Sequence, residues 1–473
     1  MTTNPIDRAS RNRRRRTALL AGAVGLTLTA SACGGGGAGD GGDLTAPGAD
    51  VLKDHDGVVE VEFWHSMETT NGKVLEALID EFNKENEGKI KVNPSFQGIY
   101  DDTLAKYRGA VQKGDTPELV QIYDIGTRFM IDAKQAIPAQ SFVDKDKYDD
   151  SKLEEGLRNY YTVDGELQAF PFNSSTPLLY INKDAFKKAG LDPEKPPKTL
   201  EEVREYSEKL TEKDGSKVEQ YGLGAAMYGW FIEQFKARAG ESYCNKGNGR
   251  EGLATEVTYD EGTAVEVVDW WKGMLDDGYA VNVGRKTEDS QAAFNSGRAA
   301  MTLDSTSALG AILDQADFEV GTGYFPLAND GDPGGSIIGG ASLWINGPGH
   351  EQVEQRASWE FVKFLLSPEA QSKWHAGTGY LSVNTDGYEQ PEAKEQTEKF
   401  PQSTTALDQL RETKPNEATA GCLLGVMSEG RMANEEGWER AVTADGADPQ
   451  EELTKSAKKM QGSIAKYNES IDN

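Results

Sequence analysis

The sequence predicts an α/β protein, because stretches with the pattern of a strand alternate with stretches that have the pattern of a helix. Apolar and polar side chains alternate in VVEVEFWH at residues 58–65, and IKVNP at residues 90–94 has a second strand pattern. Between these segments, apolar side chains recur at helical spacing at Val74, Leu75, Leu78, Ile79 and Phe82. A strand–helix–strand order favours a parallel sheet covered by helices.

The alternation continues along the rest of the chain. Strand patterns recur at residues 117–124, 178–181, 299–304 and 337–345. A capping box of Thr199 and Glu202 precedes a helix pattern with Val203, Tyr206 and Leu210. Further helices are expected at 261–275, with Val265, Val268 and Trp270 or Trp271 facing inward, and at 353–366, which ends before Pro368. No repeat with a period of 20–50 residues is present.

Size and composition indicate a folded, acidic protein with more than one domain. The 473 residues exceed the length of one typical domain about threefold. Hydrophobic residues make up 37% and aromatic residues 9%, which argues against a disordered chain. The 50 basic and 78 acidic residues give a formal net charge of −28, which argues against binding to nucleic acid. Three cysteines are too few for a scaffold built on disulfides.

The N-terminus has the features of an export signal. Arg8, Arg11 and residues 13–16 form a basic region, and the apolar stretch ALLAGAVGLTLTA precedes Ala-Ser-Ala and Cys33. A membrane span needs about 20 apolar residues, and glycines 34–37 end this stretch too early. The order A-S-A-C resembles the lipobox of bacterial lipoproteins, although Ala30 stands where the usual residue is Leu. We therefore expect residues 1–32 to be a lipoprotein signal peptide and Cys33 to carry the lipid; the Sec and twin-arginine export routes both remain open.

Residues 33–50 are rich in glycine and are expected to form a flexible tether. A flexible coil of this length has an end-to-end distance of about 20–25 Å. The globular body is expected to begin near Val51. Removal of residues 1–32 takes away six Arg and one Asp, so the mature chain is more acidic still.

Motifs of enzymes are absent from the sequence. The four histidines, His55, His65, His350 and His375, form no H-E-x-x-H motif or other close metal pair, and no C-x-x-C occurs. There is no nucleophile elbow and no P-loop. Asp330 and Asp332 lack the rest of a calcium loop and indicate a turn. We therefore expect a binding protein that is not an enzyme, with no metal and no cofactor.

Two cysteines remain after Cys33. Cys244 and Cys422 lie far apart in an exported chain, where a disulfide is permitted by the compartment. Two separate buried thiols fit the sequence equally well.

Four segments of the chain have a distinctive order of residues: FWHSM at 63–67, PFNSSTPLLYINKDAF at 171–186, IIGGASLW at 337–344 and WHAGTGYL at 374–381. They resemble the glycerol-3-phosphate-binding proteins of Ugp-type ABC importers, and the similarity extends from about residue 58 to 431. The resemblance implies two α/β lobes of the periplasmic-binding-protein type, joined by three hinge strands around a ligand cleft. The crossings are expected near residues 175–178, 302–305 and 340–343. Residues 51–175 and 305–340 would then form the N-terminal lobe, and residues 178–302 and 344–473 the C-terminal lobe.

The resemblance also implies a set of ligand contacts. Ser175, Ser305, the backbone N–H of Gly340 and the guanidinium of Arg431 would surround a phosphate. Asp124 would accept hydrogen bonds from glycerol hydroxyls, and Tyr100 and Tyr380 would cover apolar edges. Each residue also has a local explanation: a half-buried aromatic for Tyr100, a cap for Asp124, hinge turns for the serines, a bulge for Gly340 and a solvated ion pair for Arg431.

Two departures from the enteric-type members concern specificity. Asp124 stands where they have Glu, and Met227 in AMYGW stands where they have Trp. Both side chains are smaller, so the pocket is expected to admit a head group on the phosphate, such as that of glycerophosphocholine, whose choline would suit aromatic faces. The alternative is that neighbouring side chains refill the space and the ligand stays glycerol 3-phosphate.

The sequence thus predicts a solute-binding lipoprotein that captures sn-glycerol 3-phosphate or a glycerophosphodiester and closes its lobes on it. Its expected partners are membrane permease subunits, its lipid anchors it to the outer face of the cell membrane, and we expect a monomer. Two other functions remain as rivals: binding of neutral sugars or oligosaccharides, and hydrolysis of glycerophosphodiesters by a secreted enzyme.

Overall fold

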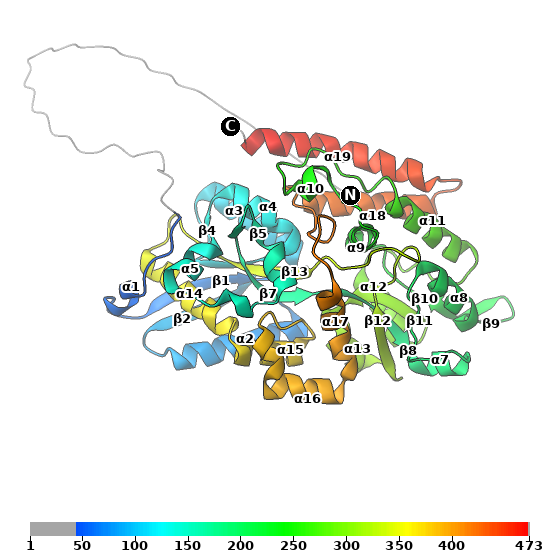
Figure 1. Ribbon diagram of the computed structural model, residues 1–473, viewed down its shortest axis with the longest axis horizontal. Coiled ribbons are helices and arrows are strands. Elements are labelled where there is room, and N and C mark those ends of the chain that lie inside the picture. Colours follow the sequence, from blue (N-terminus) through cyan, green and yellow to red (C-terminus); the bar gives the residue numbers. More distant parts are fainter. Residues whose placement is uncertain (1–43, 472–473) are drawn as a thin grey trace, which may run out of the picture. The chain divides into compact units, whose positions relative to one another are not determined.

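The computed structural model describes residues 44–471 (Figure 1). The expected signal peptide, the expected lipidation site Cys33 and most of the expected tether lie outside the described residues. The folded body begins earlier than Val51, because Ala46 is 6% exposed and its backbone N–H donates to Ser141 Oγ over 2.8 Å. Within the described residues, no helix combines the length and the apolar character that crossing a membrane requires.

The first lobe is built on a six-stranded sheet with the order β2-β1-β3-β13-β4, in which β7 also pairs with β13. β1 runs parallel to β2 and β3, while β13 runs antiparallel to its three partners. The alternation in the first strand segment is confirmed, since every second residue from Val59 to His65 is buried. The strands are β1 Val59–His65, β2 Ile90–Phe96, β3 Leu119–Tyr123, β4 Ala136–Ile137, β7 Phe170–Ser175 and β13 Gly339–Asn346.

Helices cover this sheet (Figure 1). α14 packs on β1, and α15 packs on α2. Leu75, Leu78, Ile79 and Phe82 of α2 are buried as their spacing predicts, and Phe82 contacts Phe361 of α14 with ring centroids 5.0 Å apart. The helices of this lobe are α1 Asp50–Lys53, α2 Thr69–Glu85, α3 Tyr100–Lys113, α4 Thr127–Ala133, α5 Ala139–Asp146, α6 Glu155–Tyr160, α14 Gln352–Leu365 and α15 Pro368–Thr378. A hairpin of β5 Thr162–Val163 and β6 Glu166–Leu167 follows α6.

The second lobe is built on a five-stranded sheet with the order β12-β8-β11-β10-β9. Its strands are β8 Pro177–Asn182, β9 Glu212–Asp214, β10 Lys217–Leu223, β11 Ala299–Ser305 and β12 Val320–Tyr324. Its helices are α7 Lys183–Lys188, α8 Leu200–Leu210, α9 Gly229–Arg238, α10 Asn245–Gly249, α11 Thr263–Asp276, α12 Thr287–Asn295, α13 Leu309–Gln315 and α17 Thr405–Glu412. In α11, Val268 and Trp271 are buried as expected, whereas Val265 and Trp270 are only partly buried.

The capping box expected at Thr199 is half present. Thr199 Oγ1 accepts the backbone N–H of Glu202 over 3.2 Å at the start of α8. The Glu202 carboxylate accepts the N–H of Lys198 over 2.6 Å and not that of Thr199. Pro368 begins α15 in addition to following α14.

Within the described residues, the chain passes between the two sheets three times, as expected, but two of the three crossings lie at other positions than expected. The first crossing joins β7 to β8 at residues 175–177, where the sequence predicts it. The second lies between β12 and β13, at residues 325–338, and the third lies between α15 and α17. β11 stays in the second sheet and β13 stays in the first along their whole lengths, so neither 302–305 nor 340–343 is a crossing.

The division of the chain between the lobes differs accordingly. β12, inside the segment expected in the N-terminal lobe, pairs with β8 of the second sheet. The end of β13 pairs with β3 and β4, and α14 packs on β1, so residues from 339 to the end of α15 belong with the first sheet. The reason is that the connections around these strands, and not the strands themselves, carry the chain across.

The C-terminal part adds helices to the second lobe. α16 Pro391–Lys399 leads towards α17, and α18 Met427–Thr443 packs against α9, α11 and the long helix α19 Pro449–Ile471. A disulfide joins Cys244 and Cys422, with the Cα atoms 5.9 Å apart. Of the two arrangements that the sequence leaves open for these cysteines, the structure has the disulfide.

Candidate functional site

The candidate site lies where the chain first crosses between the lobes. The backbone oxygen of Ser174, at the end of β7, accepts the N–H of Leu381 over 2.8 Å. The oxygen of Thr176 accepts the N–H of Thr306 over 3.0 Å. These two bonds bring the segments that carry Tyr380 and Ser305 to the same junction.

Tyr100 and Tyr380 meet directly, although they are far apart in the sequence. Their hydroxyl oxygens are 3.0 Å apart, and Asn173 Nδ2 donates to the Tyr100 hydroxyl over 2.7 Å. Tyr380 stacks on Trp374 with ring centroids 5.6 Å apart, while Tyr100 stacks on Tyr123 at 5.4 Å. Burial and the neighbouring Tyr380 raise the pKa of Tyr100, so its hydroxyl stays neutral and can donate or accept hydrogen bonds.

The backbone at position 340 leaves no room for a side chain. Its φ of +96° lies in the region that side chains rarely adopt, and a Cβ there would stand 1.8 Å from the backbone oxygen of Asn173. Its neighbour Gly339 pairs with Ser175 across β7 and β13. A Cβ at Gly339 would meet both Ser175 Oγ, at 3.1 Å, and the ring of Trp230, at 2.6 Å. The two glycines therefore let β13 approach β7 and α9 closely.

Arg431 on α18 connects three elements. Its Nη2 donates to Asp124 Oδ2 in the 3-10 turn after β3 over 3.0 Å. The same Nη2 donates to Glu233 Oε2 on α9 over 3.0 Å, and Nε donates to Glu233 Oε1. The three side chains are 7%, 4% and 3% exposed for Arg431, Asp124 and Glu233. A solvated ion pair is therefore the wrong explanation for Arg431, because the pair is buried.

Burial and the neighbouring charges shift the pKa values of Arg431, Asp124 and Glu233 in opposite directions. Burial raises the pKa of Glu233 to about 7, although the positive charge of Arg431 opposes the shift. Burial also raises the pKa of Asp124 against the same opposition. For Arg431, burial lowers the pKa, but the two carboxylates outweigh burial and hold it above its ordinary range. The guanidinium therefore stays charged.

The two serines occupy the same junction. Ser175 is 3% exposed at the end of β7. Ser305 ends β11, and its Oγ accepts the backbone N–H of Ser307 over 3.2 Å at the start of the following turn. A serine hydroxyl that accepts in this way still has a proton to donate.

Met227 lies in the second lobe, two residues before the start of α9. It is 1% exposed, and its backbone N–H donates to the oxygen of Gly284 over 2.9 Å. Two residues later, Gly229 packs so closely on α18 that a Cβ there would stand 3.1 Å from the Arg431 backbone oxygen.

The structure adds residues to the site that the sequence analysis missed. Asn173 stands in one of the family-like segments, but no role was assigned to it. Glu233 had a visible signal, because an acidic residue interrupts the apolar run GWFIEQF, and every residue of α9 is buried. Ser174 Oγ and Trp230 Nε1 are buried and have no hydrogen-bond partner within residues 44–471. Single residues of these types carry no sequence signal of their own.

A pocket of about 210 Å³ has Ile338, the residue before β13, in its lining. Tyr160, Ser336, Ile338, Arg411 and Asn416 are among its lining residues, which come from α6, the second crossing and the end of α17. Burial, and after it the charge of Asp124, raise the pKa of Tyr160, so its hydroxyl stays neutral. None of the expected ligand contacts lines this pocket.

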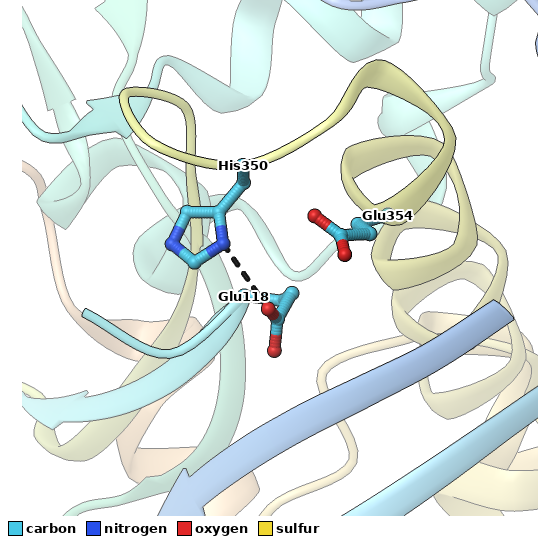
Figure 2. Close-up of side chains that lie close together, drawn as sticks. All are labelled: Glu118, His350 and Glu354. Carbon is cyan, nitrogen blue, oxygen red and sulfur yellow. Dashed lines mark hydrogen bonds and ion pairs between the residues drawn. The ribbon is translucent and has the colours of Figure 1, made fainter. Parts of the chain in front are cut away.

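A histidine and two glutamates gather in the first lobe, away from the crossing (Figure 2). Ligand atoms of Glu118, His350 and Glu354 lie within 4.8 Å of one another. Glu118 Oε1 is 3.1 Å from His350 Nδ1, and its Oε2 accepts the N–H of Glu62. Glu354 forms a capping box with Glu351 at the start of α14. These partners account for the arrangement, and we assign no metal to it.

Comparison with known proteins agrees with the fold and with the resemblance. The profile of the family described as "Bacterial extracellular solute-binding protein" matches residues 77–402. The sn-glycerol-3-phosphate-binding periplasmic protein UgpB of Pectobacterium atrosepticum is 36% identical over 419 residues, which are 87% of this chain and 92% of that protein.

Two solved structures share the fold. UgpB from Mycobacterium tuberculosis in complex with glycerophosphocholine has a TM-score of 0.73 at 22% identity, covering 86% of this chain and 99% of that one. The GacH receptor of Streptomyces glaucescens, solved unliganded and with acarbose, has a TM-score of 0.71 at 19% identity, covering 86% and 98%. The expected two-lobed α/β fold of periplasmic solute-binding proteins is thereby confirmed. The chain belongs to the family of bacterial extracellular solute-binding proteins.

Proposed function

We propose that this chain is the solute-binding component of an ABC importer and that it captures sn-glycerol 3-phosphate or a glycerophosphodiester. The name and the identity of the Pectobacterium relative support the ligand class. The observation that carries the proposal is the convergence of the family-matched residues, which come from separate segments of both lobes. Tyr100 meets Tyr380, and Asp124 meets Arg431.

Each of these residues has a role in the proposed complex. The Arg431 guanidinium, the hydroxyls of Ser175 and Ser305 and the backbone N–H of Gly340 bind phosphate oxygens. Asp124 accepts hydrogen bonds from glycerol hydroxyls. Tyr100 and Tyr380 cover the apolar edge of the glycerol. Contacts from both lobes favour the closed form, which a permease recognises, and the chain catalyses no covalent step.

Met227 forms a wall of the proposed pocket. A methionine is slimmer and more adaptable than tryptophan, so it leaves space for an esterified head group. The aromatic rings of Tyr228 and Trp230, whose centroids are 6.3 Å apart, offer faces for a choline cation in the same region. We therefore favour glycerophosphocholine over free glycerol 3-phosphate.

Export and anchoring belong to the same proposal. The signal peptide at residues 1–32 is removed, Cys33 carries the lipid, and the glycine-rich segment tethers a monomeric body to the outer face of the membrane. Mass spectrometry of the mature N-terminus tests this directly. Recovery of an unmodified Cys33 from the membrane fraction would contradict the lipid anchor.

Calorimetric titration with glycerophosphocholine, glycerol 3-phosphate and maltotriose tests the ligand class. We expect glycerophosphocholine to bind, Met227→Trp to weaken it, and Arg431→Ala to abolish binding of both phosphates. Arg440→Ala on the same helix is the matched control, because the Arg440 side chain is 44% exposed and pairs with Glu452 instead of Asp124 or Glu233. Binding of the sugar alone would favour the neutral-sugar function, and choline release during the titration would favour the hydrolase.

A further inference from the structure

Glu233 holds the Arg431 guanidinium in one orientation. It accepts from two of the three nitrogens, Nε and Nη2, and Asp124 shares Nη2. None of these three hydrogen bonds uses Nη1. One edge of the planar guanidinium is therefore fixed by a carboxylate, while the remaining nitrogen keeps its two N–H groups for another acceptor.

The group has an excess of negative charge before any ligand arrives. The charged groups that face Glu233 are Arg431 and Glu435 on α18 and Asp124 after β3. Tyr228 and Tyr243, before and after α9, also face this region, and burial raises the pKa of both, so they stay neutral. One buried cation thus stands among three carboxylates, of which Glu435 is half-buried and accepts the N–H of Gly229 over 2.9 Å.

This charge balance has a consequence for a phosphate ligand, which rests on the proposed function. A phosphodiester brings another negative charge next to carboxylates that water does not screen. The added repulsion is relieved when one buried carboxylate becomes neutral. Glu233 is poised for this, because burial raises its pKa to about 7 before a ligand is present.

We propose that Glu233 is the positioning residue that aims Nη1 of Arg431 at the ligand phosphate, and that it takes up one proton from solvent when the phosphoester binds. The proton adds to the carboxylate oxygen, no other bond changes, and the neutral carboxyl retains a carbonyl oxygen as acceptor for the guanidinium. Asp124 keeps its charge and its role towards the glycerol hydroxyls. Glu233 thereby makes affinity for an anionic ligand dependent on pH.

The test is titration calorimetry of glycerophosphocholine with the full protein between pH 6 and 9. A phosphodiester keeps a single charge over this range, so the ligand itself adds no proton. Repeating each titration in buffers of different ionisation enthalpy gives the number of protons taken up. For the native protein we expect uptake approaching one proton above pH 7, and an association constant that falls up to about tenfold per pH unit there.

Glu233→Gln and Glu435→Gln separate the proposed group from its neighbour. Gln at 233 keeps an acceptor for Arg431 but cannot titrate, so uptake and the pH dependence should disappear. Glu435→Gln removes a nearby carboxylate that makes no hydrogen bond to Arg431. It should keep the uptake of a proton, but uptake should begin at a lower pH, because the charge of Glu435 contributes to the raised pKa of Glu233.

The outcomes distinguish this inference from the proposed function. Absence of phosphoester binding at every pH would overturn the proposed function itself. Tight binding by the native protein without proton uptake would overturn the role of Glu233, whether or not the variant folds. Proton uptake that persists in Glu233→Gln, or that vanishes in Glu435→Gln, would show that another carboxylate takes up the proton. Either result would also overturn the role proposed for Glu233.

Discussion

Gly340 provides a sharp test of how the site is built. Substitution with alanine forces a side chain onto a backbone with φ +96°, which costs about 1–2 kcal/mol. The new Cβ would also stand 1.8 Å from the Asn173 oxygen, inside the paired strands β7 and β13. Overpacking of this kind costs about 1–3 kcal/mol. Together we expect Gly340→Ala to lower the free energy of unfolding by about 2–5 kcal/mol.

Gly349→Ala is the matched control. Gly349 has a similar φ of +84°, but a Cβ there meets nothing within 4 Å. It should therefore show the conformational cost without the clash, about 1–2 kcal/mol. Urea denaturation of both variants, followed by tryptophan fluorescence, measures the difference. Equal destabilisation of the two variants would refute the argument that Gly340 is required by the approach of β13 to β7.

Three further changes have definite expectations. Tyr100→Phe removes the acceptor of the Asn173 amide, so it should lower the free energy of unfolding by about 1–3 kcal/mol in urea denaturation, and an unchanged midpoint would contradict this. Hydrogen bonds from Arg356 lower the pKa of Asp146 to about 2. The pair therefore stabilises the fold at pH values above 3.8, the ordinary pKa of Asp. About 2 kcal/mol of the free energy of unfolding is lost as pH falls from 3.8 to about 2. Melting temperatures over this range should fall less steeply for Asp146→Asn than for the native protein. Burial raises the pKa of Asp304 to about 7, so stability is lost as pH rises from 3.8 to about 7; Asp304→Asn should melt higher than the native protein at pH 8 and not at pH 4.

The sequence predicts the local elements of this fold well because each one buries its own apolar face. β1 and α2 show this, since their buried positions follow the alternation and the helical spacing of the printed residues. The positions of the crossings between the lobes cannot be predicted from such local patterns. Whether a strand such as β12 pairs with β8 or with the other sheet depends on partners far away in the chain, which no local pattern specifies.

The residues of the candidate site also fall into those that the sequence predicts and those that it does not. Tyr100, Asp124, Gly340, Tyr380 and Arg431 follow from the resemblance, and the structure brings them to one junction. Glu233 does not follow, because its importance comes from the burial of the surrounding helix and from its contact with Arg431. A charge within an apolar run was the available signal. Asn173 likewise gains its role only when β7 lies beside α3.

The bond between Cys244 and Cys422 has a practical consequence for work on this protein. Cys244 follows the helix that carries Glu233, and Cys422 precedes the helix that carries Arg431, so a covalent link fastens together the two supports of the guanidinium. Material produced in the reducing cytoplasm of a host lacks this link. We therefore expect such preparations to retain their ligand less firmly than secreted material, and thiol content should be determined on each batch before affinities are compared.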